Sequence, residues 1–248
     1  MKLDKLVAYL DCLLEPAKFR DYCPNGLQVE GRAEVRRIVA GVTACQALLD
    51  AAVALEADAV LVHHGYFWRG EDGRITGMRK RRLATLLNNE MSLLAYHLPL
   101  DAHPTLGNNA QWAAALGWQA LGRFGEQDIG WFGDLPQSKT LSMVVKDLEA
   151  ALQRPPLVIG DDTRPIRRLA WCSGGAQGYF EQAIALGVDA FVSGEISEQT
   201  VHLARESGVA YLAAGHHATE RFGVCALAKQ LTDEFGLDCR YIDIDNPA

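Results

Sequence analysis

The sequence predicts an α/β protein built of two related lobes from an internal duplication, each with a mostly parallel sheet flanked by helices. Three observations predict this fold class. Short apolar segments with strand character alternate with helical segments along the chain. Residues 35–65 align without a gap on residues 166–196, sharing Arg-Arg, a Gln, and the Asp-Ala that opens a strand. The 248 residues suffice for two lobes of about 100 to 150 residues each.

The first lobe begins with an amphipathic helix, because Leu3, Leu6, Leu10 and Leu14 recur at helical spacing and Pro16 closes the segment. Strands and helices then alternate. The predicted strands are 38–42, 59–62 and 92–96, and the predicted helices are 45–55 and 82–88. This order predicts parallel pairing, which gathers the functional groups at the carboxyl ends of the strands.

The second lobe repeats this order from residue 166, with strands at 191–192 and 210–213. Residues 117–162 carry several glycines and prolines around one helical segment, 140–152, and we expect them to connect the lobes. We therefore place the first lobe, together with a C-terminal segment, at 1–125 and the second lobe at 126–248. We expect one compact two-lobe unit.

Composition limits the class of protein. Hydrophobic residues make up 49% of the chain and charged residues 22%, a balance typical of globular proteins rather than disordered or membrane proteins. Charges at Asp4, Lys5 and Asp11 interrupt the apolar start of the chain, so we expect neither a signal peptide nor a membrane span, and a cytoplasmic location. A net charge of −7 argues against a nucleic-acid partner, and we expect the basic run 79–82 on a solvated helix face. The six cysteines form no C-x-x-C pair, so we expect them to be reduced and mostly buried.

Histidines gather at the predicted ends of strands. Six of the seven lie in three short segments, 63–64, 97–103 and 216–217. A lone histidine is more often structural than a ligand, but clustering at the functional edge of an α/β sheet favours a metal site. His63 and His64 follow the predicted strand 59–62, and the repeat aligns them with Gly194 and Glu195.

Each lobe also repeats a histidine followed four residues later by a carboxylate. His97 and Asp101 form this element in the first lobe, and His216 and Glu220 form it in the second. Nitrogen and oxygen ligands without thiolate suit Zn²⁺, Mn²⁺, Fe²⁺, Co²⁺ or Ni²⁺ and do not choose among them. Three histidines and two carboxylates exceed what one catalytic ion with an open position needs, which predicts two divalent ions per chain. The candidate metal ligands are His63, His64, Asp101, His216 and Glu220.

Other residues have two interpretations each. His97 is a candidate catalytic proton shuttle or ligand, and alternatively a residue that holds Asp101 by a hydrogen bond. Glu195 is a candidate general base for a water molecule, and alternatively the N-terminal cap of a helix that begins near residue 197. His103 and His217 are candidate substrate contacts, although the substrate-binding residues as a set stay unknown. The glycine-rich segment 173–178 suits either a phosphate cradle or a tight turn.

Four segments together resemble the NIF-three-like family, whose members are known as GTP cyclohydrolase I type 2 homologues: PNGLQVEG at 24–31, HHG at 63–65, HLPLD at 97–101 and GHHATE at 215–220. The resemblance covers the whole chain and is to the short bacterial form, without the domain that longer members insert between the lobes. It implies a dinuclear centre with His64 and Asp101 on one ion, His63 and His216 on the other, and Glu220 shared between them. It also implies a ring-shaped homohexamer.

Two functions of different classes follow from these residues. The first is a dinuclear metal-dependent hydrolase acting on a small nucleotide-like substrate, and the family name extends this to a GTP cyclohydrolase reaction that opens the imidazole ring and releases formate. The second is a non-catalytic metal-binding protein for delivery, storage or regulation. Open coordination positions favour the first, and weak, exchangeable binding favours the second. An interaction scaffold would leave the clustering of histidines unexplained.

Overall fold

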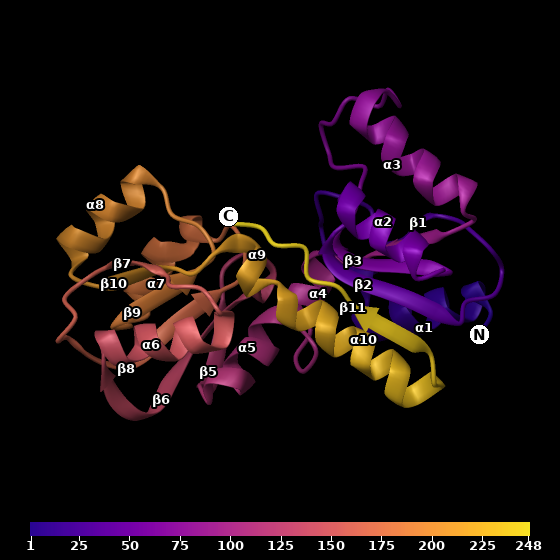
Figure 1. Ribbon diagram of the computed structural model, residues 1–248. Helices are drawn as coiled ribbons and strands as arrows, with labels where there is room; N and C mark the ends of the chain where they lie inside the picture. The colour runs from indigo at the N-terminus through magenta and orange to yellow at the C-terminus, as the bar shows by residue number, and fades with distance from the viewer. The chain divides into compact units, whose positions relative to one another are not determined.

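The computed structural model describes residues 1–248, and these form two compact units, which Figure 1 shows in its ribbon. The first unit comprises residues 1–107 and 223–245, and the second comprises 108–222 and 246–248. Each unit holds one sheet flanked by helices, so the α/β class is as predicted. The first unit ends at residue 107 instead of 125, because Trp112 and Trp118 pack into the apolar core of the second unit.

The sheet of the first unit has the strand order β1-β4-β3-β2-β11, in which β1 pairs antiparallel and the other neighbours pair parallel. Its elements are α1 (Leu3–Leu14), a 3-10 turn (Pro16–Lys18), β1 (Gly26–Val29), β2 (Arg37–Thr43), α2 (Gln46–Ala54), β3 (Ala59–His64), α3 (Gly77–Asn88), β4 (Ser92–Ala95), α4 (Leu98–Ala102), α10 (Arg221–Phe235) and β11 (Asp238–Tyr241). The unit boundary falls inside α10. The basic run 79–82 lies on α3, but only Lys80 and Arg81 are exposed while Arg79 and Arg82 are half-buried, so the expectation of a solvated face holds for half of the run.

Both faces of this sheet are covered. Along β3, Ala59 and Leu61 join an apolar cluster with α1 and α10, whereas Val60 and Val62 join a second cluster with α2 and α3. The alternation follows from the two-residue period of a strand, which points successive side chains to opposite faces. Figure 1 shows α2 and α3 on one side of the first sheet and α1 and α10 on the other. A strand buried on both faces needs a continuous apolar sequence, which the segment 59–62 provides.

The sheet of the second unit has the order β5-β6-β8-β9-β10-β7. Its elements are α5 (Asn108–Leu116), β5 (Gln119–Phe124), a 3-10 turn (Glu126–Asp128), β6 (Gly130–Thr140), α6 (Leu141–Leu152), β7 (Leu157–Ile159), β8 (Pro165–Cys172), a second 3-10 turn (Gln177–Tyr179), α7 (Phe180–Ala185), β9 (Ala190–Ser193), α8 (Glu198–Ser207), β10 (Ala210–Ala213) and α9 (His216–Thr219). Only β8, β9 and β10 pair parallel, so this sheet is more mixed than the sequence predicts. Residues 117–162 are part of this unit, because β5, β6 and β7 are strands of its sheet rather than a connection between lobes.

The two units share their central topology. Three neighbouring strands pair parallel in each sheet, β2, β3 and β4 in the first unit and β8, β9 and β10 in the second. One antiparallel edge strand, β1 beside β4 or β7 beside β10, completes this side of the sheet. Asp58 Oδ2 accepts hydrogen bonds from the backbone N–H groups of Arg36 and Arg37 at 2.8 and 2.9 Å. Asp189 Oδ2 accepts from the equivalent pair, residues 167 and 168, at 2.8 and 3.0 Å. The Arg-Arg and Asp-Ala matches in the sequence therefore correspond to one structural feature present twice, which supports the duplication.

None of the helices combines the length and apolar composition needed to cross a membrane. None of the six cysteines forms a disulfide. Only Cys23 and Cys172 are buried, and Cys12 is exposed, so the expectation of mostly buried cysteines is wrong. The reason is local, since Cys12 lies on the face of α1 that does not pack against the sheet.

Candidate metal centre

The first unit places His63 beside Asp101. Both histidines of the pair at 63–64 are the last residues of β3 itself, and Asp101 lies on α4 after the neighbouring strand β4. His63 is fully buried, and its Nδ1 lies 3.0 Å from the carbonyl oxygen of Tyr96. A carbonyl oxygen only accepts, so Nδ1 carries the proton and Nε2 is the nitrogen available to a ligand. This Nε2 lies 3.5 Å from Asp101 Oδ2, and Asp101 is itself buried.

Two more imidazoles stand next to His63. The ring centroid of His64 is 4.6 Å away and that of His97 is 5.1 Å away. One ring nitrogen from each of the three histidines lies within 4.8 Å of the others. His64 Nδ1 lies 3.3 Å from Thr43 Oγ1, which adds a weak contact from β2. The first unit therefore gathers three imidazoles and one carboxylate at the carboxyl end of its parallel strands.

A carboxylate that the sequence analysis missed holds His97. Asp21, whose side chain is only 4% exposed, places Oδ1 2.7 Å from His97 Nδ1. Burial disfavours the charged carboxylate, but the hydrogen bonds from His97, Asn25 and the Tyr22 N–H and the charge of His97 outweigh it and lower the pKa of Asp21 to about 2. The residue bonded to His97 Nδ1 is therefore Asp21, which is not one of the candidate residues that the sequence suggested.

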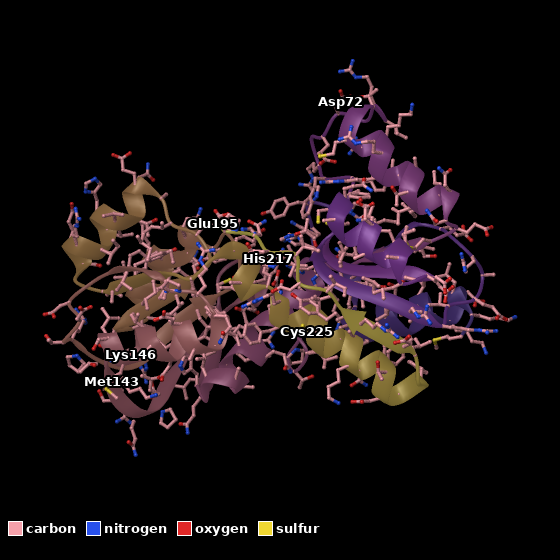
Figure 2. The ribbon with its side chains drawn as sticks, viewed as in Figure 1. Asp72, Met143, Lys146, Glu195, His217 and Cys225 are labelled. Atoms are coloured by element: carbon pink, nitrogen blue, oxygen red, sulfur yellow. The ribbon has the colours of Figure 1, made fainter.

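The second unit pairs His216 with two carboxylates. His216 begins α9, and its Nε2 lies 3.2 Å from Oε1 of Glu220, which is 2% exposed. Its Nδ1 lies 2.8 Å from Oε1 of Glu195, an exposed residue just after β9 that Figure 2 labels. Burial disfavours the imidazolium, but these two carboxylates outweigh it and raise the pKa of His216 to about 9. The hydrogen bond with His216 also lowers the pKa of Glu195.

Glu195 is not a helix cap. The cap of α8 is Ser197, whose hydroxyl accepts a hydrogen bond from the Thr200 N–H at 3.4 Å. Glu195 instead accepts a hydrogen bond from Gln177 Nε2 at 3.1 Å on its second oxygen. With one oxygen on His216 and the other on Gln177, the carboxylate is arranged to orient the imidazole.

Glycines make room for this cluster. A Cβ on Gly174, which has φ +66°, would lie 2.3 Å from Glu220 Oε1 and 3.3 Å from His216 Nε2. A Cβ on Gly194 would lie 2.6 Å from the Gly174 carbonyl oxygen and 2.7 Å from His216 Cα. The glycine-rich segment 173–178 thus leaves space for the two candidate ligands. The close approach of Gly194 to Gly174 and His216 also explains why the second repeat has glycine at the position where the first repeat has His63.

The separations within each unit suit a shared ion. Two ligand atoms that bind one ion at about 2.0 to 2.2 Å, with an angle of about 90 to 110°, lie about 3 to 3.5 Å apart. The His63–Asp101 and His216–Glu220 pairs, at 3.5 and 3.2 Å, match this edge length. The resemblance differs for the first pair, because it implies that Asp101 shares its ion with His64. The ligand atoms are nitrogen and oxygen without sulfur, which suits first-row divalent ions. Each unit therefore contributes residues that could serve as ligands of a metal ion.

The remaining histidines have other contacts. His103 Nδ1 accepts the backbone N–H of Leu106 at 3.0 Å, a local bond that stabilises the turn after α4. His217, labelled in Figure 2, is 9% exposed, and its backbone N–H donates to the carbonyl of Ala248 at 3.3 Å. His202 lies on α8.

Fold and site together define a duplicated α/β protein whose units each carry histidines and carboxylates arranged for metal binding at the carboxyl ends of parallel strands. The chain belongs to the Duf34/NIF3 (NGG1p interacting factor 3) family, whose family model matches residues 1–247. This confirms the resemblance seen in the sequence.

Known proteins similar to this chain span its whole length. A Pseudomonas aeruginosa protein named GTP cyclohydrolase 1 type 2 homolog is 56% identical over 249 residues, which are 99% of this chain and 98% of that protein. The Escherichia coli protein of the same name is 52% identical over 250 residues and all of both chains. A solved structure described as protein ybgI, of unknown function, is 50% identical with a TM-score of 0.96 and full coverage of both chains. A solved structure from Thermus thermophilus is 37% identical with a TM-score of 0.90, covering 100% of this chain and 99% of that one.

Proposed function

We propose that the chain is a metal-dependent hydrolase acting on a small nucleotide-like molecule, with two divalent ions per chain held by His63, His64, Asp101, His216 and Glu220. The observation that carries the proposal is the pairing of imidazole nitrogen with carboxylate oxygen at 3.5 and 3.2 Å in the two units. When bound, a pair of divalent ions polarises the bond to be cleaved and lowers the pKa of water. The names of the curated relatives support a cyclohydrolase reaction, in which the imidazole ring of GTP opens and formate leaves.

The protein's own residues hold and orient these ligands. The Tyr96 carbonyl binds Nδ1 of His63, and the Glu195 carboxylate binds Nδ1 of His216. In both residues this leaves Nε2 as the ligand atom. Glu220 is the ligand that we expect both ions to share, as the family resemblance implies, and the two cations would balance the charge of its buried carboxylate. His97 is the candidate group for accepting and returning a proton, and we assign Glu195 to orienting His216 instead of to proton abstraction.

The proposal is tested on protein purified without a metal-affinity tag. Elemental analysis should find close to two divalent ions per chain, and a screen of nucleotides for released formate and phosphate should find a product whose formation stops when the ions are removed. Two bound ions with no product from any nucleotide would contradict the hydrolase and favour a role in metal delivery or storage. One ion or none after reconstitution would contradict the dinuclear centre.

Replacing the ligands one at a time tests the assignment within the site. Glu220→Ala should depopulate both ions, because a shared carboxylate supplies charge to two cations at once. Asp101→Ala should deplete mainly one ion, whereas His97→Ala should keep both and lower activity by about 10 to 100-fold. Metal stoichiometry of the folded variants by mass spectrometry, with anomalous scattering to locate the emptied position, checks this. If Glu220→Ala keeps both ions while His97→Ala loses one, His97 is a ligand and Glu220 is not.

A further inference from the structure

We propose that Asp21 is a positioning residue that holds His97 in the tautomer with the proton on Nδ1, so that Nε2 presents its lone pair toward His63 and His64. The tautomer follows from hydrogen bonding alone, and only the chemical use of Nε2 rests on the function proposed above. Asp21 is not among the candidate site residues that the sequence indicates.

The first step is the hydrogen bonding of Asp21. Its Oδ1 accepts the Tyr22 N–H at 2.6 Å and lies 2.7 Å from His97 Nδ1. Its Oδ2 accepts Asn25 Nδ2 at 2.8 Å and the Leu98 N–H at 3.0 Å. Backbone N–H groups only donate, so both oxygens already act as acceptors. Because a carboxyl group is a stronger acid than an imidazolium, the proton between Asp21 and His97 belongs to Nδ1.

The second step is the fixed placement of His97. Its backbone N–H donates to Asn25 Oδ1 at 2.7 Å, while the amide of the same Asn25 donates to Asp21. The loop at 21–25 therefore binds the main chain of His97 through Asn25 and its side chain through Asp21. An imidazole held at both its backbone and its Nδ1 has little freedom to rotate, which fixes the direction of Nε2.

The third step is what surrounds the ring on its other side. The centroids of His63, His64 and Trp68 lie 5.1, 5.5 and 5.0 Å from the His97 centroid. The side chain of His97 is 13% exposed. With Nδ1 turned to Asp21, Nε2 is the nitrogen left for the cluster of imidazoles.

The second unit contains the same arrangement at the equivalent position. His216 and His97 each begin an element in which a carboxylate follows the histidine four positions later, and His216 Nδ1 lies 2.8 Å from Glu195 Oε1. The two carboxylates come from different places, since Asp21 precedes β1 and Glu195 follows β9. A carboxylate therefore holds Nδ1 of the duplicated histidine in both units. The two carboxylates do not occupy equivalent positions of the repeat.

This arrangement suits a proton carrier. A neutral His97 accepts a proton at Nε2 from a water molecule or substrate atom and becomes an imidazolium, while Nδ1 keeps its own proton. The Asp21 carboxylate then faces a full positive charge at 2.7 Å, stabilises it, and does not itself take up the proton. Return of the Nε2 proton to the leaving atom restores the starting state.

The test reads the tautomer directly. Long-range ¹⁵N–¹H correlation spectra of histidine-labelled, Zn²⁺-loaded wild-type protein should show a protonated Nδ1 and an unprotonated Nε2 for His97, with the signal assigned by its loss in His97→Gln. A protonated Nε2 on His97 in the wild-type protein would overturn the proposal, and this measurement does not depend on any variant of Asp21 folding.

Asp21→Asn should reverse the tautomer. Two fixed donors, from Asn25 and Leu98, surround Oδ2, whereas only the Tyr22 N–H is a fixed donor beside Oδ1. The new amide nitrogen should therefore take the Oδ1 position and donate to His97 Nδ1, which moves the ring proton to Nε2.

The matched control is Asp11→Asn, which removes another partly buried carboxylate of the same unit, one that accepts the Tyr96 hydroxyl at 2.7 Å. It should leave the His97 tautomer unchanged. An unchanged tautomer in folded Asp21→Asn, or the same reversal in Asp11→Asn, would overturn the proposal. Absence of hydrolysis by the wild-type protein would refute the proposed function while leaving the tautomer result intact, so the two failures are distinguishable. Metal content should stay at the wild-type level in Asp21→Asn, and loss of an ion there would make His97 a ligand rather than a proton carrier.

Discussion

Replacing Gly174 with alanine should separate metal binding from stability. The backbone at Gly174 has φ +66°, and an L-residue in this left-handed region costs about 1 to 2 kcal/mol. The added Cβ would also lie 2.3 Å from Glu220 Oε1, where an unstrained contact needs about 3.4 Å or more. The carboxylate must therefore move by about 1 Å, whereas metal-ligand distances tolerate only about 0.2 Å. We expect Gly174→Ala to lose the ions that Glu220 helps to hold.

Gly187→Ala is the matched control. Gly187 lies in the same unit with φ +68°, and a Cβ there would meet nothing within 4 Å. Both variants should lower the melting temperature by about 2 to 4 °C for each kcal/mol of backbone cost. Only Gly174→Ala should lose metal when both are equilibrated with Mn²⁺ and measured by mass spectrometry and calorimetry. Full metal content in folded Gly174→Ala would refute the role of Glu220 as a ligand, and metal loss in Gly187→Ala would show that backbone strain alone empties the site.

Two further predictions concern His216. Carboxylates raise the pKa of His216 to about 9, so below pH 9 the imidazole binds a proton that an entering ion must displace. Calorimetric titration with Mn²⁺ in buffers of different ionisation enthalpy should therefore show release of about one proton per ion at His216 between pH 7 and 9, with affinity rising as pH rises and levelling above pH 9, and a flat profile would contradict this. Glu195→Gln removes the charge beside Nδ1 and should weaken metal binding about 10 to 100-fold, measured by the same titration, whereas an unchanged affinity would leave Glu195 without an orienting role.

The parts of the fold that the sequence predicts well are those with a strong period. The four leucines of α1 and the buried strand 59–62 lie where predicted, because burial of one helix stripe or of both strand faces constrains the residue types directly. Residues 117–162 were misplaced, since their glycines and prolines indicate turns but do not show which strands those turns join. The antiparallel pairing of β6 with β8, in which Trp131 lies opposite Trp171, joins strands that are not consecutive in the chain, and a local pattern does not reveal it.

The candidate ligands were found because they cluster beside strand ends, and the structure places His63 beside Asp101 and His216 beside Glu220. The partners of these histidines were harder to predict. Asp21 lies 76 residues before His97 in a loop without periodicity, so no spacing links the two. Its one local signal is a carboxylate just before the Pro-Asn-Gly segment at 24–26, and many surface loops share that composition.

The interrupted path of the chain through the first unit has a consequence for folding. Residues 108–222, 115 in all, separate β4 and α4 from α10 and β11, which complete the sheet and cover one of its faces. During synthesis residues 108–222 of the second unit are therefore made before the first unit has all its strands. Prior folding of those 115 residues would shorten the flexible loop that must close, and the entropy of closure rises with loop length. We therefore expect completion of the first unit to depend on early folding of residues 108–222. Until β11 is synthesised, the edge of β2 has no strand partner and is exposed to other chains.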